Sequence, residues 1–379
     1  MNVDQLLDRA VVICCGTGGV GKTTAAAAIG LEAARRGRRA CVVTIDPAKR
    51  LANTLGLSVL SDTPTEISRE HWDPDGLSHG ALFALMLDTK STFDRVIARY
   101  AGDADQVERI LHNRFYRNVS GALGGTQEYM AMEKLHELHA DASFDFIVVD
   151  TPPTRHALDF VDAPSRLLRL LDNRVFRLLM MPTRAYLKVA SIAVQGFLRT
   201  VARVVGRDVI DDVVAFFRAF EGMEAGFRAR AESVQQLIAD PATAFVLVTT
   251  PRRDAVDEAD YFARRLVDHR LEIDALVVNR VHPSFTSTPA AALVARADEL
   301  ADLADLDLAH RYRLLAEMQS TVERERAELD RVIDRLGDTP VAMVALLPSD
   351  VHDLESLGAI GHELFGAATP GPGTTRSGG

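Results

Sequence analysis

The sequence predicts an α/β fold in which a mostly parallel β-sheet is covered by helices, with a helical subdomain inserted into it. Short apolar runs alternate with longer helical patterns, as expected for strands that are buried on both faces of a sheet. A glycine-rich loop follows the first run, and one long stretch contains helical patterns only. The predicted strands are Val11–Cys15, Cys41–Ile45, Leu82–Leu87, Phe146–Val149, Phe245–Val248, Ala275–Val278 and Val341–Leu346.

The segment directly after the first run has the sequence of a phosphate-binding loop. It fits the pattern G-x-x-x-x-G-K-[ST], whose glycines let successive backbone N–H groups face one anion. We expect Lys22 to act in catalysis by neutralising the β- and γ-phosphates of a nucleotide, and the Thr23 hydroxyl to hold Mg²⁺. This loop makes the predicted fold that of a phosphate-loop NTPase. The residues expected to bind the nucleotide here are Gly16, Thr17, Gly18, Gly19, Val20, Gly21, Lys22, Thr23 and Thr24.

Helical patterns fill the gaps between the apolar runs. One helix is expected from Thr23 to Arg36, ending at Gly37, a residue typical of helix C-termini. A later segment, His310–Leu336, is charge-dense on one face and predicts a solvated structural helix.

An aspartate, Asp46, follows the second predicted strand. Ligands bind at this edge of an open parallel sheet, where a carboxylate can orient a water in line with the γ-phosphate. The same residue can instead cap a turn or helix, which the following Pro47 would also suit. Asp46 is therefore a candidate catalytic residue.

A second aspartate, Asp150, ends the run Phe146–Val149. A carboxylate there is the expected acidic partner of the phosphate loop and holds Mg²⁺, usually through water. The motif is weak by itself, because many buried strands end in aspartate. Pro152 and Pro153 form a stiff segment beside it that could move as a unit when the γ-phosphate is lost, which is the behaviour of a switch.

From about Pro164 to Ala239 the sequence shows helical patterns and no convincing strand. Within it, Arg174–Val205 is unusually apolar, with an apolar stripe wider than one core needs. Either the region packs on itself or across a dimer interface, or it binds a hydrophobic client or touches a membrane. We expect a nucleotide-binding α/β core over 1–163 and 240–365, a helical insertion over 164–239, and a disordered tail over 366–379.

Composition excludes several classes of function. The net charge of −10 over 379 residues disfavours non-specific nucleic-acid binding, so no nucleic-acid partner is expected. There is no run of 18 apolar residues and no signal-peptide core, which predicts a cytoplasmic protein, with a peripheral position at the membrane left open. Cys14, Cys15 and Cys41 fall in predicted strands without a C-x-x-C pair, as small core side chains do.

Together these residues resemble the arsenical-pump ATPases and the tail-anchored-protein-targeting ATPases, within the deviant phosphate-loop class that also holds the cell-division-site and plasmid-partitioning ATPases. The resemblance spans about residues 10–365. Asp46-Pro47-Ala48 is similar to the family's first switch, and residues 150–156, D-T-P-P-T-R-H, to its second, usually D-T-A-P-T-G-H. Supporting stretches are Leu87-Asp88, Gln127-Glu128, Thr250-Pro251, Val278-Asn279-Arg280 and Leu346-Leu347-Pro348.

The resemblance implies an ATPase that uses ATP and Mg²⁺ and forms a nucleotide-bridged dimer, which opens and closes with hydrolysis. It also implies that Asn279 contacts the adenine and that Pro348 lies in a loop beside the base.

Several positions depart from the family pattern. The class normally has a lysine at the second position of the loop, which reaches the partner's phosphates; here that position is Thr17. Arg155 replaces the glycine of the second switch and is either a cation beside the γ-phosphate or an arginine at the solvent or at an interface. The arsenite-binding cysteines and the zinc-binding C-x-x-C have no counterpart.

Three functions remain open on these observations. The first is a dimeric ATPase switch whose helical subdomain handles a hydrophobic protein client or a membrane protein, as a homodimer or as a heterodimer with a lysine-bearing paralogue. The second is the energising subunit of an anion or metalloid transporter. The third is a non-enzymatic, nucleotide-gated scaffold of the spatial-organiser type.

Overall fold

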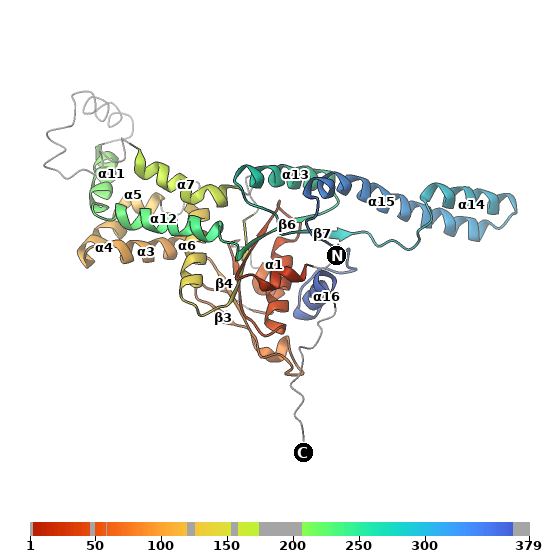
Figure 1. Ribbon diagram of the computed structural model, residues 1–379, viewed down its shortest axis with the longest axis horizontal. Helices are drawn as coiled ribbons and strands as arrows, with labels where there is room; N and C mark the ends of the chain where they lie inside the picture. The colour runs from red at the N-terminus through yellow and green to blue at the C-terminus, as the bar shows by residue number, and fades with distance from the viewer. Residues whose placement is uncertain are drawn as a thin grey trace, which may run out of the picture.

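The computed structural model describes residues 3–45, 50–57, 59–119, 126–152, 158–173 and 207–366. At its centre lies an eight-stranded sheet in the order β3-β4-β2-β5-β1-β6-β7-β8 (Figure 1). Neighbouring strands are parallel, except that β3 is antiparallel to β4. The α/β fold and all seven predicted strands are thus confirmed. The strands are β1 (Val11–Cys15), β2 (Arg39–Thr44), β3 (Thr65–Glu66), β4 (Ala81–Met86), β5 (Phe146–Asp150), β6 (Thr243–Thr249), β7 (Ala275–Val281) and β8 (Val341–Ala345).

Two strands differ from the sequence prediction. The edge strand β3 was not predicted, because two polar residues carry no apolar pattern. β7 runs three residues past Val278, where its pairing with β8 shifts register before Val281 meets Ala345. This irregularity has the features of a β-bulge, which bends a strand and redirects its side chains.

Helices cover both faces of the sheet. One face packs against α1 (Lys22–Arg35) and α16 (Leu354–Phe365), with the short α2 (Arg50–Thr54) beside them. The other face packs against α6, α7, α12, α13 and the end of α15. Alternate residues of each strand join the two cores, so that Val12 faces α1 while Ile13 faces the opposite layer. The second layer consists of α6 (Thr126–Ala140), α7 (Leu158–Asp172), α12 (Glu224–Ile238), α13 (Arg253–Asp268) and α15 (Leu306–Leu336).

A third hydrophobic cluster lies among helices at one end of the molecule, away from the sheet (Figure 1). It is rich in aromatic rings, with Phe216 packed on Phe220 at a centroid distance of 4.7 Å. The described parts of the region 164–239 are helical, as predicted. The apolar segment 174–206 lies outside the described residues, and the boundaries of the predicted insertion stay a prediction. Besides α7 and α12, the cluster contains α3 (Thr89–Tyr100), α4 (Ala104–Leu111), α5 (Arg114–Val119) and α11 (Arg207–Ala219).

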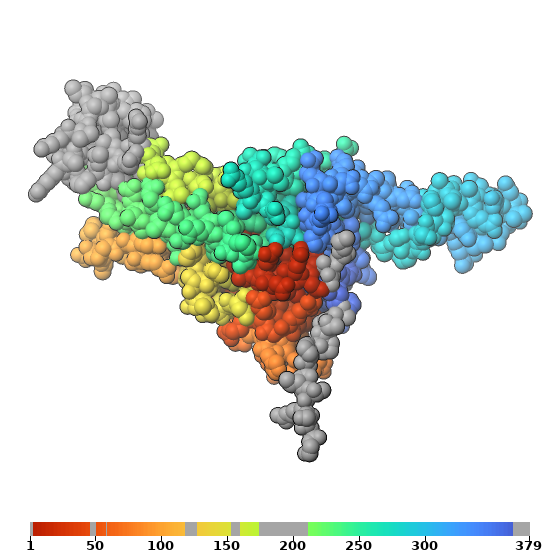
Figure 2. Space-filling view, viewed as in Figure 1, coloured from red at the N-terminus to blue at the C-terminus, as the bar shows by residue number. Residues whose placement is uncertain are grey.

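At the opposite end, α14 (Ala290–Asp302) and the first half of α15 form a two-helix projection (Figure 2). The predicted helix His310–Leu336 is confirmed, and it begins earlier, where the Asp305 carboxylate accepts a hydrogen bond from the Leu308 N–H at 3.3 Å. Most of α15 is exposed, as predicted. Within the described ranges, no helix combines the length and the apolar character needed to cross a membrane. Short 3₁₀ turns occur at Asp4–Asp8 and Arg69–His71.

A buried ion pair joins α6 to α12. Arg230 donates from Nε to both carboxylate oxygens of Glu133 at 2.8 Å, and the two residues are 9% and 2% exposed. Removing one partner leaves the other charge buried without compensation, which costs far more than the pair itself contributes.

We therefore expect Arg230→Met to lower the free energy of unfolding by about 3–5 kcal/mol, measured by urea denaturation. The double variant Glu133→Leu/Arg230→Met buries no charge and should recover much of this loss. A double variant as unstable as the sum of the single changes would contradict this interpretation.

Candidate functional site

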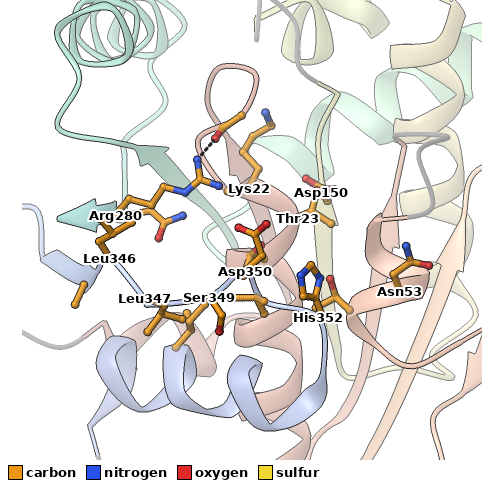
Figure 3. Close-up of a pocket in the computed structure, with 18 of the residues that line it drawn as sticks. Lys22, Thr23, Asn53, Asp150, Arg280, Leu346, Leu347, Ser349, Asp350 and His352 are labelled. Carbon is orange, nitrogen blue, oxygen red and sulfur yellow. Dashed lines mark hydrogen bonds between the residues drawn. The ribbon is translucent and has the colours of Figure 1, made fainter. Parts of the chain in front are cut away.

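A cavity of about 510 Å³ opens at the carboxyl ends of the central strands (Figure 3). The loop between β1 and α1, the end of β5 and the bulged end of β7 meet there. Ligands bind at this edge of open α/β sheets. The described residues that line it are Gly19, Gly21, Lys22, Thr23, Thr24, Asn53, Thr54, Asp150, Thr151, Asn279, Arg280, Ala345, Leu346, Leu347, Ser349, Asp350, Val351, His352 and Ile360.

Two glycines of the loop are required by close packing. A Cβ on Gly16 would lie 2.2 Å from the carbonyl oxygen of Val248, so the loop passes directly over β6. A Cβ on Gly21 would lie 2.1 Å from Nδ2 of Asn279, and Gly21 also has a left-handed backbone with φ of 98°. A larger residue at either position would push the loop off the strands that support it.

Lys22 begins α1 and is almost fully buried, at 6% exposed. Its Nζ donates a hydrogen bond to the carbonyl oxygen of Thr17 at 2.7 Å, so the ammonium group folds back across the loop. The positive end of the α1 dipole points into the same space. A cation, the loop amides and a helix N-terminus together suit a bound phosphate chain.

Thr23 and Asp150 lie side by side at the base of the cavity. The Thr23 hydroxyl donates to Oδ2 of Asp150 at 2.7 Å, and the Thr44 hydroxyl donates to the same oxygen at 3.0 Å. Strand pairing explains this arrangement, because β5 lies between β1 and β2 and places Asp150 opposite both Cys14 and Thr44.

This donor set fits Mg²⁺. The ion prefers hydroxyl, carboxylate and water oxygens, and it keeps several waters when it binds with a nucleotide. One carboxylate and one hydroxyl from the protein are therefore sufficient. The described residues contain no cluster of three or more His, Cys, Asp or Glu that could enclose a metal by themselves.

Asn279 is fixed against the loop from the β7 side. Its Nδ2 donates to the carbonyl oxygen of Val20 at 2.9 Å, and the residue lines the cavity. Leu346 and Leu347 supply apolar surface beside it, whereas the expected Pro348 lies between lining residues without being one of them.

The segment that leads to Asp46 is held at the same edge. The Ile45 N–H donates to the Asp150 carbonyl oxygen at 3.3 Å, and Nε2 of Gln127 in α6 donates to the Ile45 carbonyl oxygen at 3.1 Å. Asp46 itself lies outside the described residues, as does Arg155. The role assigned to Asp46 stays a prediction.

The structure therefore brings together most of the residues selected from the sequence. Gly19, Gly21, Lys22, Thr23, Thr24, Asp150 and Asn279 line the cavity, while Gly16, Thr17, Gly18 and Val20 belong to the same loop without lining it. Sequence reasoning did not select Asn53, Thr54, Ser349, Asp350 and His352. These residues carry no motif, because only the packing of α2 and of the loop between β8 and α16 brings them to the site.

The three cysteines, two in β1 and one in β2, are fully buried. Burial raises the pKa of the Cys15 and Cys41 thiols to about 12, and it also raises that of Cys14. The thiolate is the form that reacts with electrophiles and binds soft metals, so these thiols are inert in the folded protein at neutral pH.

We expect N-ethylmaleimide to modify none of the three cysteines in the native protein at pH 7 and all three in urea, as read by mass spectrometry. Rapid modification of the native chain would show that this part of the sheet opens.

Comparisons with known proteins point to one family. The sequence profile of the family described as Anion-transporting ATPase matches residues 9–302. A protein of Aquifex aeolicus whose name refers to an arsenical pump-driving ATPase is 24% identical over 279 residues, which are 72% of this chain and 63% of that relative. The chain thus spans less than two thirds of the length of that relative.

In two further relatives, the match extends over a larger share of the relative's length. A protein of Aspergillus terreus named ATPase get3 is 23% identical over 269 residues, which are 70% of this chain and 71% of that protein. A Mycobacterium tuberculosis protein whose name states no function is 26% identical over 366 residues, which are 94% of this chain and 76% of that protein.

Proposed function

The chain belongs to the anion-transporting ATPase family, and on that premise we propose that it binds ATP with Mg²⁺ in the cavity beside the phosphate loop and hydrolyses it. The observation that carries this proposal is the convergence of Lys22, Thr23 and Asp150 at one strand edge, with Thr23 and Asp150 in direct hydrogen-bond contact. These three side chains have the types that phosphoryl transfer requires.

Each residue has a distinct proposed role. Lys22 neutralises the β- and γ-phosphates, and the N–H groups of residues 18–22 cradle them. Thr23 and Asp150 hold Mg²⁺, the latter through water; the ion, when bound, balances the charge of the phosphates. Asp46 orients the attacking water and accepts its proton.

Hydrolysis is tested by phosphate release from ATP by the purified chain, with Mg²⁺ and with excess EDTA. The proposal requires release with Mg²⁺ and its loss in EDTA, with recovery when Mg²⁺ is added back. Release that is unaffected by EDTA would contradict the proposed role of Thr23 and Asp150.

We further propose that hydrolysis opens and closes a dimer and that the helical region, 164–239, handles a hydrophobic protein client or a membrane protein. The aromatic cluster, to which α7, α11 and α12 of this region contribute together with α3, α4 and α5, supports this by supplying helices separate from the nucleotide site. Recovery of partners from a detergent extract in ATP and in ADP tests the switch. Equal recovery in both nucleotides would count against it.

Thr17 motivates a more specific proposal about the dimer. Because threonine supplies no charge, a partner's phosphates would lack their cross-subunit cation in a homodimer. We propose a heterodimer with a paralogue that retains the lysine. If the pure homodimer hydrolyses ATP as fast as the co-purified complex, and Thr17→Lys leaves the rate unchanged, this proposal fails.

A second candidate function, the energising subunit of an anion or metalloid transporter, is favoured by the name of the Aquifex relative. The buried thiols count against arsenite as the activator. Oxyanion-stimulated phosphate release would favour this function over the client-handling switch.

A third candidate, a nucleotide-gated scaffold, needs binding without turnover. It would be favoured by ATP-dependent assembly of a chain that releases no phosphate.

A further inference from the structure

The side chain of Arg280, which comes from outside the phosphate loop, lies over the loop. Arg280, near the end of β7, donates from Nη1 to the carbonyl oxygen of Gly19 at 3.1 Å (Figure 3). The residue is exposed, lines the cavity together with Lys22, and reaches the loop from β7, which is separated from β1 by β6.

The backbone at this position is arranged to hold the side chain there. Arg280 has a left-handed conformation with φ of 62°, which is unfavourable for any residue with a Cβ and persists only where other contacts enforce it. It lies within the register shift between Val278 and Val281. As a result, two consecutive residues bind two consecutive loop carbonyls: Asn279 binds Val20, and Arg280 binds Gly19.

The charged residues that line the cavity indicate what Arg280 could bind. Among the described lining residues, Lys22 and Arg280 are cations, and Asp150 and Asp350 are anions. Arg280 is thus one of two cations among these residues, and its charge makes the cavity more favourable for a polyanionic ligand. A guanidinium has five N–H donors, so the contact with Gly19 leaves donors free for phosphate oxygens.

We propose that Arg280 contacts the phosphate groups of the nucleotide bound in its own protomer. This inference rests on the proposed function, because it assigns a further residue to the same nucleotide site. It assigns Arg280 to phosphate recognition and Asn279 to the base.

The test compares Arg280→Asn with wild type for binding of ATP, ADP and adenosine in the full chain. Asparagine tolerates the left-handed backbone and removes only the charge and reach. We expect ATP and ADP to bind about tenfold more weakly and adenosine to bind as in wild type. Arg280→Lys should restore part of the affinity for ATP.

The chain offers a matched control. Arg270 is also an exposed arginine in the left-handed conformation, with φ of 59°, but it follows α13 and does not line the cavity. Arg270→Asn makes the same chemical change and should leave all three affinities unchanged. Arg280→Gly relieves the backbone strain, so it should unfold at no lower a temperature than wild type and still lose affinity for ATP.

The outcomes distinguish a wrong assignment of Arg280 from the absence of a nucleotide site. If wild type binds ATP and Arg280→Asn binds it equally well, the assignment of Arg280 is wrong while the nucleotide site stands. An equal loss for adenosine and ATP would place Arg280 on the base and overturn its phosphate role. If wild type binds neither ATP nor ADP, the proposed function and this inference fail together.

Discussion

Replacing Lys22 by methionine should abolish most ATP hydrolysis, with a loss of about 100- to 1,000-fold in kcat. Lys22 is 6% exposed and lies at the start of α1. Because the site is buried, solvent cannot replace the positive charge that the variant lacks. Methionine fills nearly the same volume, so the core around α1 is preserved while the ammonium group is removed. The rate of phosphate release at saturating ATP measures the effect.

Lys90→Met is the matched control, because Lys90 lies on α3 and pairs with Asp94 at the surface. It should leave hydrolysis unchanged. A Lys22→Met variant that turns over at the wild-type rate would remove this lysine from the mechanism. Its loss also breaks the hydrogen bond to Thr17, which, as a bond from a charged group, contributes about 1.5–3 kcal/mol to stability. This effect on folding is separate from the effect on kcat.

Asp46→Asn should separate binding from turnover. Asparagine cannot accept a proton from the attacking water, so we expect kcat to fall by about 100- to 10,000-fold while ATP binds within about twofold of wild type. The preceding residue, Ile45, hydrogen-bonds with Asp150 and Gln127 at the edge of the site.

The control for this variant is Asp302→Asn, which changes an exposed carboxylate at the end of α14. Binding is measured by calorimetric titration and turnover by phosphate release. Unchanged hydrolysis in Asp46→Asn would leave the residue with the capping role that Pro47 also suits. Lost ATP binding would instead make it a structural residue of the site.

The sequence predicts the parts of this molecule that depend on local pattern. Val11–Cys15 and the other apolar runs become strands because burial on both faces requires continuous apolar residues. The proximity of Thr23 and Asp150 can be predicted from the sequence. Thr23 belongs to the contiguous phosphate-loop motif, and Asp150 ends a parallel strand whose carboxyl end lies at the same edge of the sheet.

Other features depend on tertiary packing and carry no local signal. Asp350 reaches the cavity only because its loop follows β8 and precedes α16. Arg280 has a left-handed backbone that arginine rarely adopts, and the bulge beside it appears only when β7 pairs with β8. The short β3 forms only because its backbone pairs with that of β4 at the edge of the sheet.

The most direct test of the account is a single-turnover experiment with the purified chain in excess over ATP and with Mg²⁺ present. Bound nucleotide and released phosphate are followed together, with Lys22→Met alongside. The account predicts that wild type binds ATP and converts it to ADP and phosphate, whereas Lys22→Met releases little phosphate. Wild-type protein that binds no ATP, or releases no more phosphate than Lys22→Met, would contradict it.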